Sequence, residues 1–281
     1  MNFQGIAVAD LEIWLDARES GLTFTLPECH QDFILNRASS GGLNLRVRDD
    51  KCLQCEAWMP VHNSSVTWQL WKDGSGTFIF VLPEIAPPKR HVRVNPDFNA
   101  GEVIGEFSQG SNLYPLQNIE IKVFINWLAG FGDLVLHAVG LSLEGRGYCF
   151  MGPSGSGKST LAGALKSIPG VKILGEDNIV LRYIDDRFLI YGTPWHLDRG
   201  MCSPAWAPLE KIFFLDRSIP PGESKSDPLQ GITSILQTAF IPYYRPETLP
   251  KILDRLVTLS TRVPFACAHY ELGSDPAVFL Q

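Results

Sequence analysis

The sequence predicts an α/β protein in which a P-loop-containing mixed sheet, flanked by helices, follows a β-rich N-terminal domain. Short apolar or alternating runs separated by Gly, Pro, Asn and Asp fill the chain up to about residue 110. From residue 119 onward, amphipathic helical patterns alternate with buried strand runs. Gly152–Ser159 fits the phosphate-binding pattern GxxxxGK[ST] between a strand and a helix. We therefore expect a first domain over 1–115 and a second over 116–281.

The expected elements of the first domain are strands. Runs at 43–47, 66–71 and 77–82 have strand character, and Asp73–Gly76 between the last two is typical of a hairpin turn. This region shows no internal repeat and no chemical motif. We expect it to serve packing or to present an acceptor.

The expected elements of the second domain alternate between helices and strands. Ile121, Phe124, Ile125 and Leu128 share one face of a helix. Helices are expected over 119–129, 158–167, 228–239 (with Asp227 as its cap) and 249–259. Strands are expected over 134–139, 148–151, 171–174, 178–183, 188–191, 211–215 and 263–272, with an exposed loop over 216–227.

Composition and charge exclude several classes of protein. The 281 residues carry 24 Lys+Arg against 30 Asp+Glu, a net charge of −6, and 45% are hydrophobic. This is a globular composition, and its mild acidity argues against a nucleic-acid partner. No apolar run approaches the length of a membrane span, so no membrane partner is expected. The start of the chain lacks the basic residues of a secretory signal, which predicts a cytoplasmic location.

The six cysteines are too few for a disulfide scaffold. A zinc site could be drawn from Cys52 and Cys55 with Cys29, His30 and His62. However, a second CxxC or CxxH at finger spacing is missing. Cys52 and Cys55 also sit in a strand-like stretch that would point them to opposite faces. We expect reduced thiols instead.

The P-loop predicts a nucleotide polyphosphate and a metal ion, here ATP and Mg²⁺. Its glycines let backbone N–H groups turn toward phosphate oxygens, and the following helix offers a positive dipole end. Lys158 would contact the β- and γ-phosphates and Ser159 would bind Mg²⁺. Without ligand, Lys158 should face solvent. The candidate nucleotide-binding residues are Gly152, Pro153, Ser154, Gly155, Ser156, Gly157, Lys158, Ser159 and Thr160.

A pair of acids, Glu176 and Asp177, follows the predicted strand 171–174. Ligands of open α/β sheets bind at the carboxyl ends of strands, where one acid can hold Mg²⁺ and the other accept a proton. Solvated turn acids are the alternative. Asp216, at the end of the strand 211–215, is a second candidate metal acid, with the alternative that it only ends the strand before the Pro-rich loop. The signatures of ABC ATPases and of small GTPases are absent.

These residues resemble the C-terminal domain of bacterial HPr kinase/phosphorylase and its relatives that phosphorylate other targets. The likeness spans about 135–193 and is strongest at Leu136–Ala138, the P-loop, Gly175–Asp177 and Tyr191–Trp195. It implies a P-loop fold similar to that of phosphoenolpyruvate carboxykinase.

The resemblance also implies roles for individual residues. The family's acid pair is usually Asp-Asp, so Glu176 departs by one methylene while Asp177 keeps its type. Asp177 is therefore the candidate essential acid, with Glu176 as a metal ligand alongside Ser159 and Asp177. A histidine in a similar strand contributes to the family's phosphate site, which makes His137 a catalytic candidate with Asp177 and Lys158.

The sequence thus predicts a kinase: an ATP- and Mg²⁺-dependent phosphotransferase acting on a hydroxyl, most plausibly of a Ser in a protein or peptide. The N-terminal region differs from that of HPr kinase/phosphorylase, so HPr itself is not expected as acceptor. Thr193, Trp195 and His196 are candidates to face the acceptor, and packing of Trp195 is the alternative. The alternative function is a catalytically inactive nucleotide-binding sensor or assembly factor. A small-molecule kinase differs only in acceptor, and the oligomeric state, including a homo-oligomer, stays open.

Overall fold

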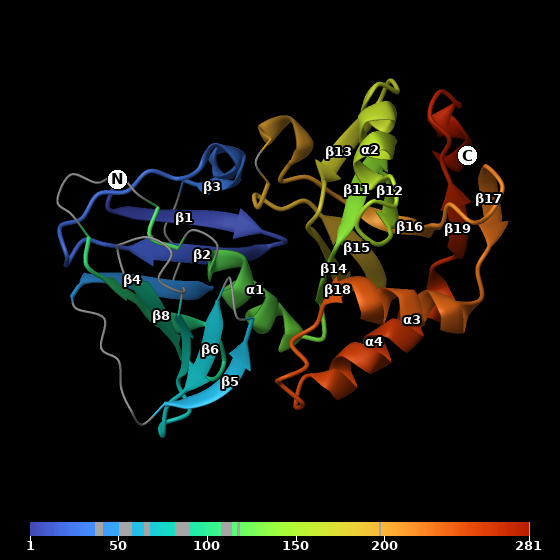
Figure 1. Ribbon diagram of the computed structural model, residues 1–281. Coiled ribbons are helices and arrows are strands. Elements are labelled where there is room, and N and C mark those ends of the chain that lie inside the picture. The colour runs from blue at the N-terminus through green and yellow to red at the C-terminus, as the bar shows by residue number, and fades with distance from the viewer. Residues whose placement is uncertain are drawn as a thin grey trace. The chain divides into compact units, whose positions relative to one another are not determined.

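The chain divides into two compact units, Met1–Trp127 and Leu128–Gln281 (Figure 1). The functional division into 1–115 and 116–281 stays a prediction. Both Cys52 and Cys55, and the first residues of the expected strand 66–71, lie outside the described part of the chain. The computed structural model describes residues 1–36, 42–50, 58–64, 68–81, 90–107, 114–116, 119–196 and 198–280.

The described residues of the first unit form one mixed sheet of nine strands in the order β3-β1-β2-β4-β9-β8-β7-β6-β5. The predicted turn at Asp73–Gly76 joins β6 to β7, and Asp73 N–H donates to the Thr77 carbonyl at 3.0 Å. The strands are β1 (Phe3–Val8), β2 (Leu11–Asp16), β3 (Ile34–Leu35), β4 (Leu43–Asp49), β5 (Met59–Asn63), β6 (Gln69–Lys72), β7 (Phe78–Val81), β8 (Arg90–Val94) and β9 (Ala100–Gly105). A short 3-10 helix, η1 (Glu28–Phe33), lies beside β1, and α1 (Glu120–Ala129) begins in this unit.

A buried polar cluster ties η1 to α1. Glu120 accepts hydrogen bonds from the Tyr114 hydroxyl at 2.5 Å and is 2.7 Å from Nε2 of His30. The Glu120 carboxylate thus engages Nε2 of His30, and the zinc alternative that includes this histidine depends on Cys52 and Cys55, which lie outside the described residues. The cysteines of the described residues, which include Cys29, are free thiols.

The second unit contains a sheet of ten strands, counted over the described residues, and three helices beyond α1. Its main path runs β13-β11-β12-β16-β15-β14-β10-β18, with β19 pairing β16 and β17. The strands are β10 (Leu134–Leu136), β11 (Ala138–Leu143), β12 (Arg146–Met151), β13 (Val171–Gly175), β14 (Ile179–Ile184), β15 (Arg187–Tyr191), β16 (Trp206–Leu215), β17 (Gly222–Lys225), β18 (Ala239–Phe240) and β19 (Phe265–His269). The helices are α2 (Lys158–Lys166), α3 (Pro228–Thr238) and α4 (Leu249–Arg262), with 3-10 turns η3 (Arg199–Met201) and η4 (Pro276–Leu280).

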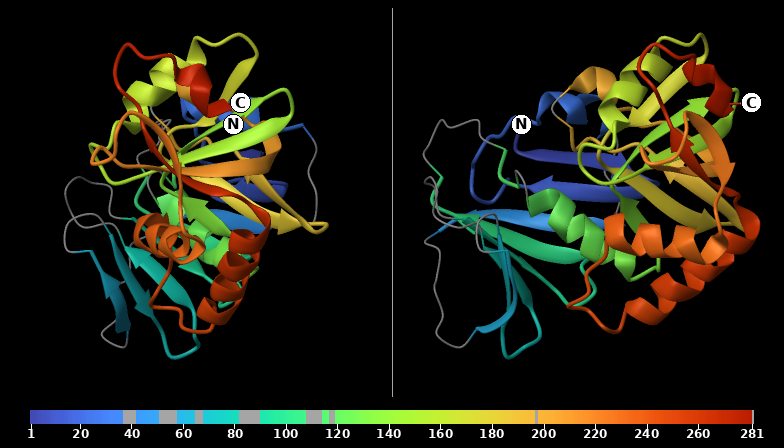
Figure 2. Two further views of the ribbon diagram at one scale, coloured as in Figure 1. Left: turned by 90° about the vertical axis from the view of Figure 1, so that its right-hand side faces the viewer. Right: turned by 45° about the vertical axis from the view of Figure 1, so that its right-hand side comes forward.

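Alternating residues of the central strands belong to two hydrophobic cores, one on each face of the sheet. On β12, Phe150 packs with Leu161 and Leu165 of α2, whereas Met151 packs with Ile235 of α3 and the buried side of α4. Because successive strand residues point to opposite faces, the sheet is buried on both sides. The unit is therefore a mixed α/β structure in which α2 covers one face, and α3 and α4 lie side by side on the other (Figure 2).

Several predicted elements differ from the observed ones. The single strand expected over 134–139 breaks at His137, because β10 pairs with β14 and β18 whereas β11 pairs with β12 and β13. The strand expected to start at Lys211 starts at Trp206, where its first residues pair with β15. The loop expected over 216–227 contains β17, a polar edge strand. Asp227 caps α3 as predicted, accepting the N–H groups of Leu229 and Gln230.

Helix α4 has an apolar stripe that packs on the sheet, but not every leucine of the helix belongs to it. Ile252, Leu256 and Leu259 are buried, but Leu253 is 48% exposed. Within the described residues, no helix is both long and apolar enough to cross a membrane.

Candidate functional site

The sheet of the second unit brings the P-loop and the acid pair to one edge. β11 runs antiparallel to both β12 and β13, so β12 and β13 run in the same direction. The P-loop follows the end of β12, and Gly175-Glu176-Asp177 follows the end of β13. His137 precedes β11, whose first residue pairs with Met151 at the end of β12. All three features therefore meet at the carboxyl end of the parallel strands, where ligands bind in such sheets.

The P-loop has a backbone that only small residues allow. Gly155 and Gly157 have φ values of 79° and 102°, in the left-handed region that favours glycine. A Cβ at Gly152 would lie 2.6 Å from the Ser156 hydroxyl oxygen, so a side chain there would fill the loop. That hydroxyl oxygen is buried and has no hydrogen-bond partner within the described residues. The loop is thus closely wound and holds a polar atom that a phosphate oxygen could satisfy.

Lys158, the P-loop lysine, is buried rather than solvent-facing. Only 6% of the residue is exposed, and its ammonium donates to the carbonyls of Gly152 at 2.8 Å and Pro153 at 3.1 Å. Burial lowers its pKa, while the negative charges of Asp177 and Glu176 act in the opposite direction. The expectation of a solvent-facing side chain is wrong because the loop's own carbonyls satisfy the ammonium donors.

The two acids differ in exposure. The Glu176 side chain is 10% exposed and that of Asp177 is 51% exposed. Asp177 has a φ of 78°, an unfavourable conformation for a residue with a side chain, which costs free energy and is common at functional sites. His137 Nδ1 lies 3.2 Å from the Asp177 carbonyl and 3.9 Å from its carboxylate. His137 thus holds the turn that presents Asp177.

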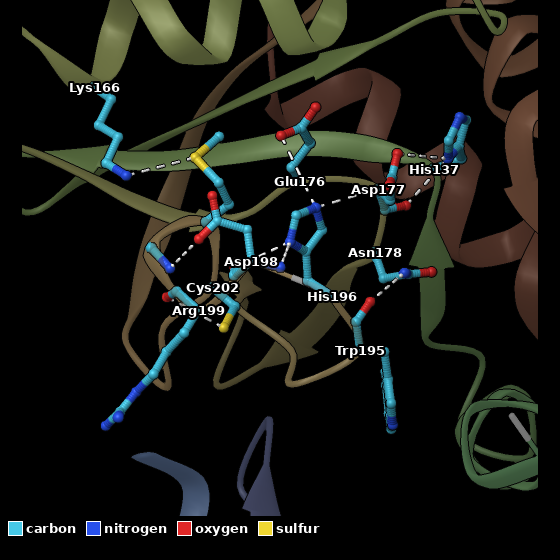
Figure 3. Close-up of polar contacts among 12 residues, drawn as sticks. His137, Lys166, Glu176, Asp177, Asn178, Trp195, His196, Asp198, Arg199 and Cys202 are labelled. Atoms are coloured by element: carbon cyan, nitrogen blue, oxygen red, sulfur yellow. Dashed lines mark hydrogen bonds and ion pairs between the residues drawn. The ribbon is translucent and has the colours of Figure 1, made fainter. Parts of the chain in front are cut away.

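The loop that follows β15, through Gly192–Trp195, places His196 beside both acids (Figure 3). Its Nε2 lies 4.0 Å from a carboxylate oxygen of Glu176 and 4.0 Å from one of Asp177. Gly192 permits this path, because a Cβ there would lie 1.9 Å from the Ser203 carbonyl oxygen and 2.2 Å from that of Leu174.

Two hydrogen bonds fix the loop against the acid turn. The Thr193 hydroxyl donates to the Asn178 carbonyl at 2.8 Å, and the Asn178 amide donates to the Trp195 carbonyl at 3.0 Å. Thr193 is only 2% exposed, so the expectation that it faces an acceptor is wrong. Its hydroxyl is used to close the loop.

The other ring nitrogen of His196 meets both a donor and an acceptor. Nδ1 is 2.9 Å from the Asp198 N–H and 3.0 Å from the Asp198 carbonyl oxygen. The neutral ring can accept the N–H at Nδ1 and carry its proton on Nε2, toward the acids. The cationic ring can donate from Nδ1 to the carbonyl. The ring is therefore held in place in either protonation state.

Asp216 lies at the end of β16, which runs parallel to β12. Its carboxylate accepts the Ser218 N–H at 2.8 Å, and hydrogen bonding from Ser218 holds the pKa of Asp216 below its ordinary value. It also borders a pocket of about 260 Å³ between Gly152, Pro153 and the polar side of α3. Asp216 is thus engaged in a local turn, beside the P-loop and apart from the acid pair.

Within the described residues, no group of three or more His, Cys, Asp or Glu side chains is arranged to hold a metal ion by itself. Mg²⁺ commonly binds through one or two carboxylates together with substrate phosphates, so a preformed cage is not required. Ser159 and Thr160 are exposed at the start of α2. Within the described residues, neither hydroxyl makes a hydrogen bond to the acids, and the assignment of Ser159 and Thr160 as ligand contacts remains a prediction.

Sequence reasoning missed the position of His196 between the two acids. The signal available was the histidine following Gly192–Trp195, but its approach to Glu176 depends on loop geometry that no spacing rule gives.

The comparisons with known proteins found a structural likeness without a sequence match. No family model matches the chain, and no curated protein matches it. Among solved structures, the HPr(Ser) kinase/phosphatase from Coxiella burnetii is similar over 52% of this chain and 85% of that chain, with 15% sequence identity and a TM-score of 0.31.

Proposed function

We propose that this protein is an ATP- and Mg²⁺-dependent phosphotransferase that phosphorylates a hydroxyl group, that of a Ser in a protein or peptide. The observation that carries the proposal is the meeting of a closely wound P-loop and an acid pair at one sheet edge. The two are near enough that the charges of Asp177 and Glu176 act on the pKa of Lys158. A P-loop alone binds phosphates, whereas an adjacent pair of acids adds the groups that phosphoryl transfer requires.

The P-loop residues fit a phosphate chain. Three features lie at the start of α2. The Ser156 hydroxyl is buried and has no hydrogen-bond partner within the described residues. Gly155 and Gly157 have left-handed backbone conformations, and Lys158 supplies an ammonium group. On ligand binding, Lys158 would exchange two carbonyl partners for phosphate oxygens. That exchange replaces neutral acceptors by charged ones, which roughly doubles the strength of each hydrogen bond.

The exposure of the acids supports different roles. The Asp177 side chain is half exposed, so an acceptor that arrives from solvent can contact it. We therefore assign Asp177 the role of the base that accepts the proton of the acceptor hydroxyl. Glu176 is nearly buried and is better suited to hold Mg²⁺ at a fixed position. Mg·ATP would supply the phosphoryl group, which passes to the acceptor oxygen as the nucleoside diphosphate leaves, while the acceptor proton goes to Asp177.

His137 and His196 act on the acids in this scheme. His137 holds the Asp177 backbone, and His196 faces both carboxylates with one ring nitrogen. Nε2 of His196 lies 4.0 Å from an oxygen of each carboxylate, so this polar ring atom is placed beside two adjacent acids. Identification of a Ser acceptor rests on the resemblance of the motifs to the HPr kinase/phosphorylase group.

Substitution of Lys158 tests nucleotide binding. Lys158→Ala removes the cation that faces the phosphates, so the affinity for Mg·ATP should fall by about 10-fold or more, the size expected for one charge-assisted hydrogen bond. Isothermal titration calorimetry measures it. Lys166→Ala, at the far end of α2 where the ammonium contacts the Met201 sulfur, is the matched control and should bind as the wild type. Unchanged affinity in Lys158→Ala would remove the P-loop assignment.

A further inference from the structure

A second cation lies against the P-loop. A Cβ built on Gly157 would lie 3.3 Å from Nη2 and 3.9 Å from Nε of Arg217, and those guanidinium atoms are its neighbours within 4 Å. Gly157 directly precedes Lys158 and caps the N-terminus of α2. The guanidinium therefore lies at the N-terminus of α2. This is the place where the Lys and the Ser of a P-loop, here Lys158 and Ser159, bind phosphate and its metal ion.

The fold accounts for this position. Met151 pairs with Phe214 in the parallel strands β12 and β16, so the segment after β16 leaves the sheet beside the P-loop. The Asp216 carboxylate accepts the Ser218 N–H and forms a local turn around Arg217. Asp216, considered from the sequence as a metal acid, thus shapes the turn that carries the arginine.

The charges around Gly157 favour an anion there. The Arg217 guanidinium lies at the positive end of the α2 dipole, which begins with Lys158, and a cation at a helix N-terminus is unfavourable by itself. Arg217 is exposed and, within the described residues, makes no hydrogen bond or ion pair that would hold it there. Planar guanidinium groups bind phosphate oxygens with two parallel hydrogen bonds.

We propose that Arg217 is a second polyphosphate-binding residue, which works with Lys158 to hold the phosphate chain of the nucleotide. This inference rests on the proposed function. The acid pair adds two negative charges near a highly charged substrate, and Lys158 and a bound Mg²⁺ would offset part of that charge. Arg217 adds a cation on the side of the P-loop formed by β16, away from β13.

The test compares Arg217→Ala and Arg217→Lys in the full-length chain by calorimetric titration with Mg·ATP, inorganic tripolyphosphate and AMP. Arg217→Ala should weaken Mg·ATP and tripolyphosphate on the order of 10- to 100-fold, the range expected for a lost charge-assisted pair. AMP binding should not change. Arg217→Lys should regain part of the loss, because it keeps the charge and loses the bidentate geometry.

Arg187→Ala is the matched control. Arg187 is also exposed, but it starts β15, and the pairs Leu189–Pro208 and Leu209–Gly147 place that strand near the opposite end of β12. This variant should bind all three ligands as the wild type does. Circular dichroism melting of each variant should match the wild type.

The outcomes separate the two proposals. If the wild type binds neither Mg·ATP nor tripolyphosphate, both proposals are overturned. If the wild type binds and Arg217→Ala binds equally well, the role of Arg217 is overturned while the proposed function stands. An equal loss for AMP and tripolyphosphate would also overturn it, because the arginine would then act on more than the phosphate chain.

Discussion

Single residues decide the chemistry of the proposed site, and their environments are unequal. Adjacent in sequence, Glu176 and Asp177 are 10% and 51% exposed, because Asp177 takes a left-handed backbone conformation that turns the chain outward. The sequence predicts the acid pair, but this difference in exposure follows from the turn and from its contact with His137. The roles of the two acids can therefore be tested separately.

Asp177→Asn keeps the size of the side chain and removes its charge. If Asp177 accepts the proton, Mg·ATP should still bind while transfer falls by roughly 10²- to 10⁴-fold. Glu176→Gln should act through metal affinity, so raised Mg²⁺ should partly restore it. Steady-state transfer rates across a Mg²⁺ titration measure both. Rescue of Asp177→Asn by Mg²⁺, with Glu176→Gln unaffected at every concentration, would exchange the two roles.

At the scale of elements, the sheet edge and one loop build the site. The P-loop between β12 and α2, and the acids after β13, are predictable because strand–loop–helix context and strand ends have sequence signals. The approach of His196 to the acids is not, because it depends on a close backbone contact at Gly192 between segments far apart in the sequence. The break at His137 is also hidden, since the apolar run continues through it.

Gly192→Ala tests whether this loop matters for transfer. The new methyl group would collide with the carbonyl oxygens of Ser203 and Leu174, so the loop that carries His196 must shift. Transfer should fall by about 10-fold or more, since misplacement of positioning groups by an ångström can cost about 100-fold, while Mg·ATP affinity is retained. Transfer assays and calorimetry measure the two effects.

Gly163→Ala is the matched control for that substitution. Gly163 lies in α2 with no atom within 4 Å of a built Cβ, so alanine should keep activity and stabilise the helix by up to about 1 kcal/mol. Normal transfer by Gly192→Ala would show that the position of His196 is not needed.

At the scale of the whole molecule, the two units differ in how well the sequence predicts them. The helices and strands of the second unit have clear sequence signals, namely helix periodicity and buried apolar runs, because both faces of its sheet are covered. The first unit has a nine-stranded order, over its described residues, that no local pattern specifies, because β2, β4 and β9 are joined by parallel pairing between distant segments. Its buried titratable groups link its stability to pH.

His91 makes the first unit less stable in acid. Burial lowers its pKa from 6.5 to about 4, so the unfolded chain binds a proton below pH 6.5 that the folded chain does not bind until about pH 4. The contribution of neutral His91 to stability is complete above pH 6.5 and is lost as the pH falls toward 4. The slope contributed by this group is at most about 1.4 kcal/mol per pH unit.

Denaturant unfolding at several pH values measures this slope. His91→Gln, which does not titrate, should flatten the curve between pH 4 and 6.5 even if it lowers stability at neutral pH. His62→Gln is the control, since His62 lies on an outer strand and is partly exposed. An unchanged slope in His91→Gln would show that His91 is not the group responsible.

The most direct test of the central claim is transfer of the γ-phosphate of labelled ATP to a Ser-containing peptide library, with a matched library in which Ser is replaced by Ala. The site predicts label on the Ser library alone, dependent on Mg²⁺, lost in Lys158→Ala and strongly reduced in Asp177→Asn. Binding of Mg·ATP without transfer to any hydroxyl acceptor, in peptides or in added proteins and small alcohols, would contradict it and identify a nucleotide-binding sensor instead.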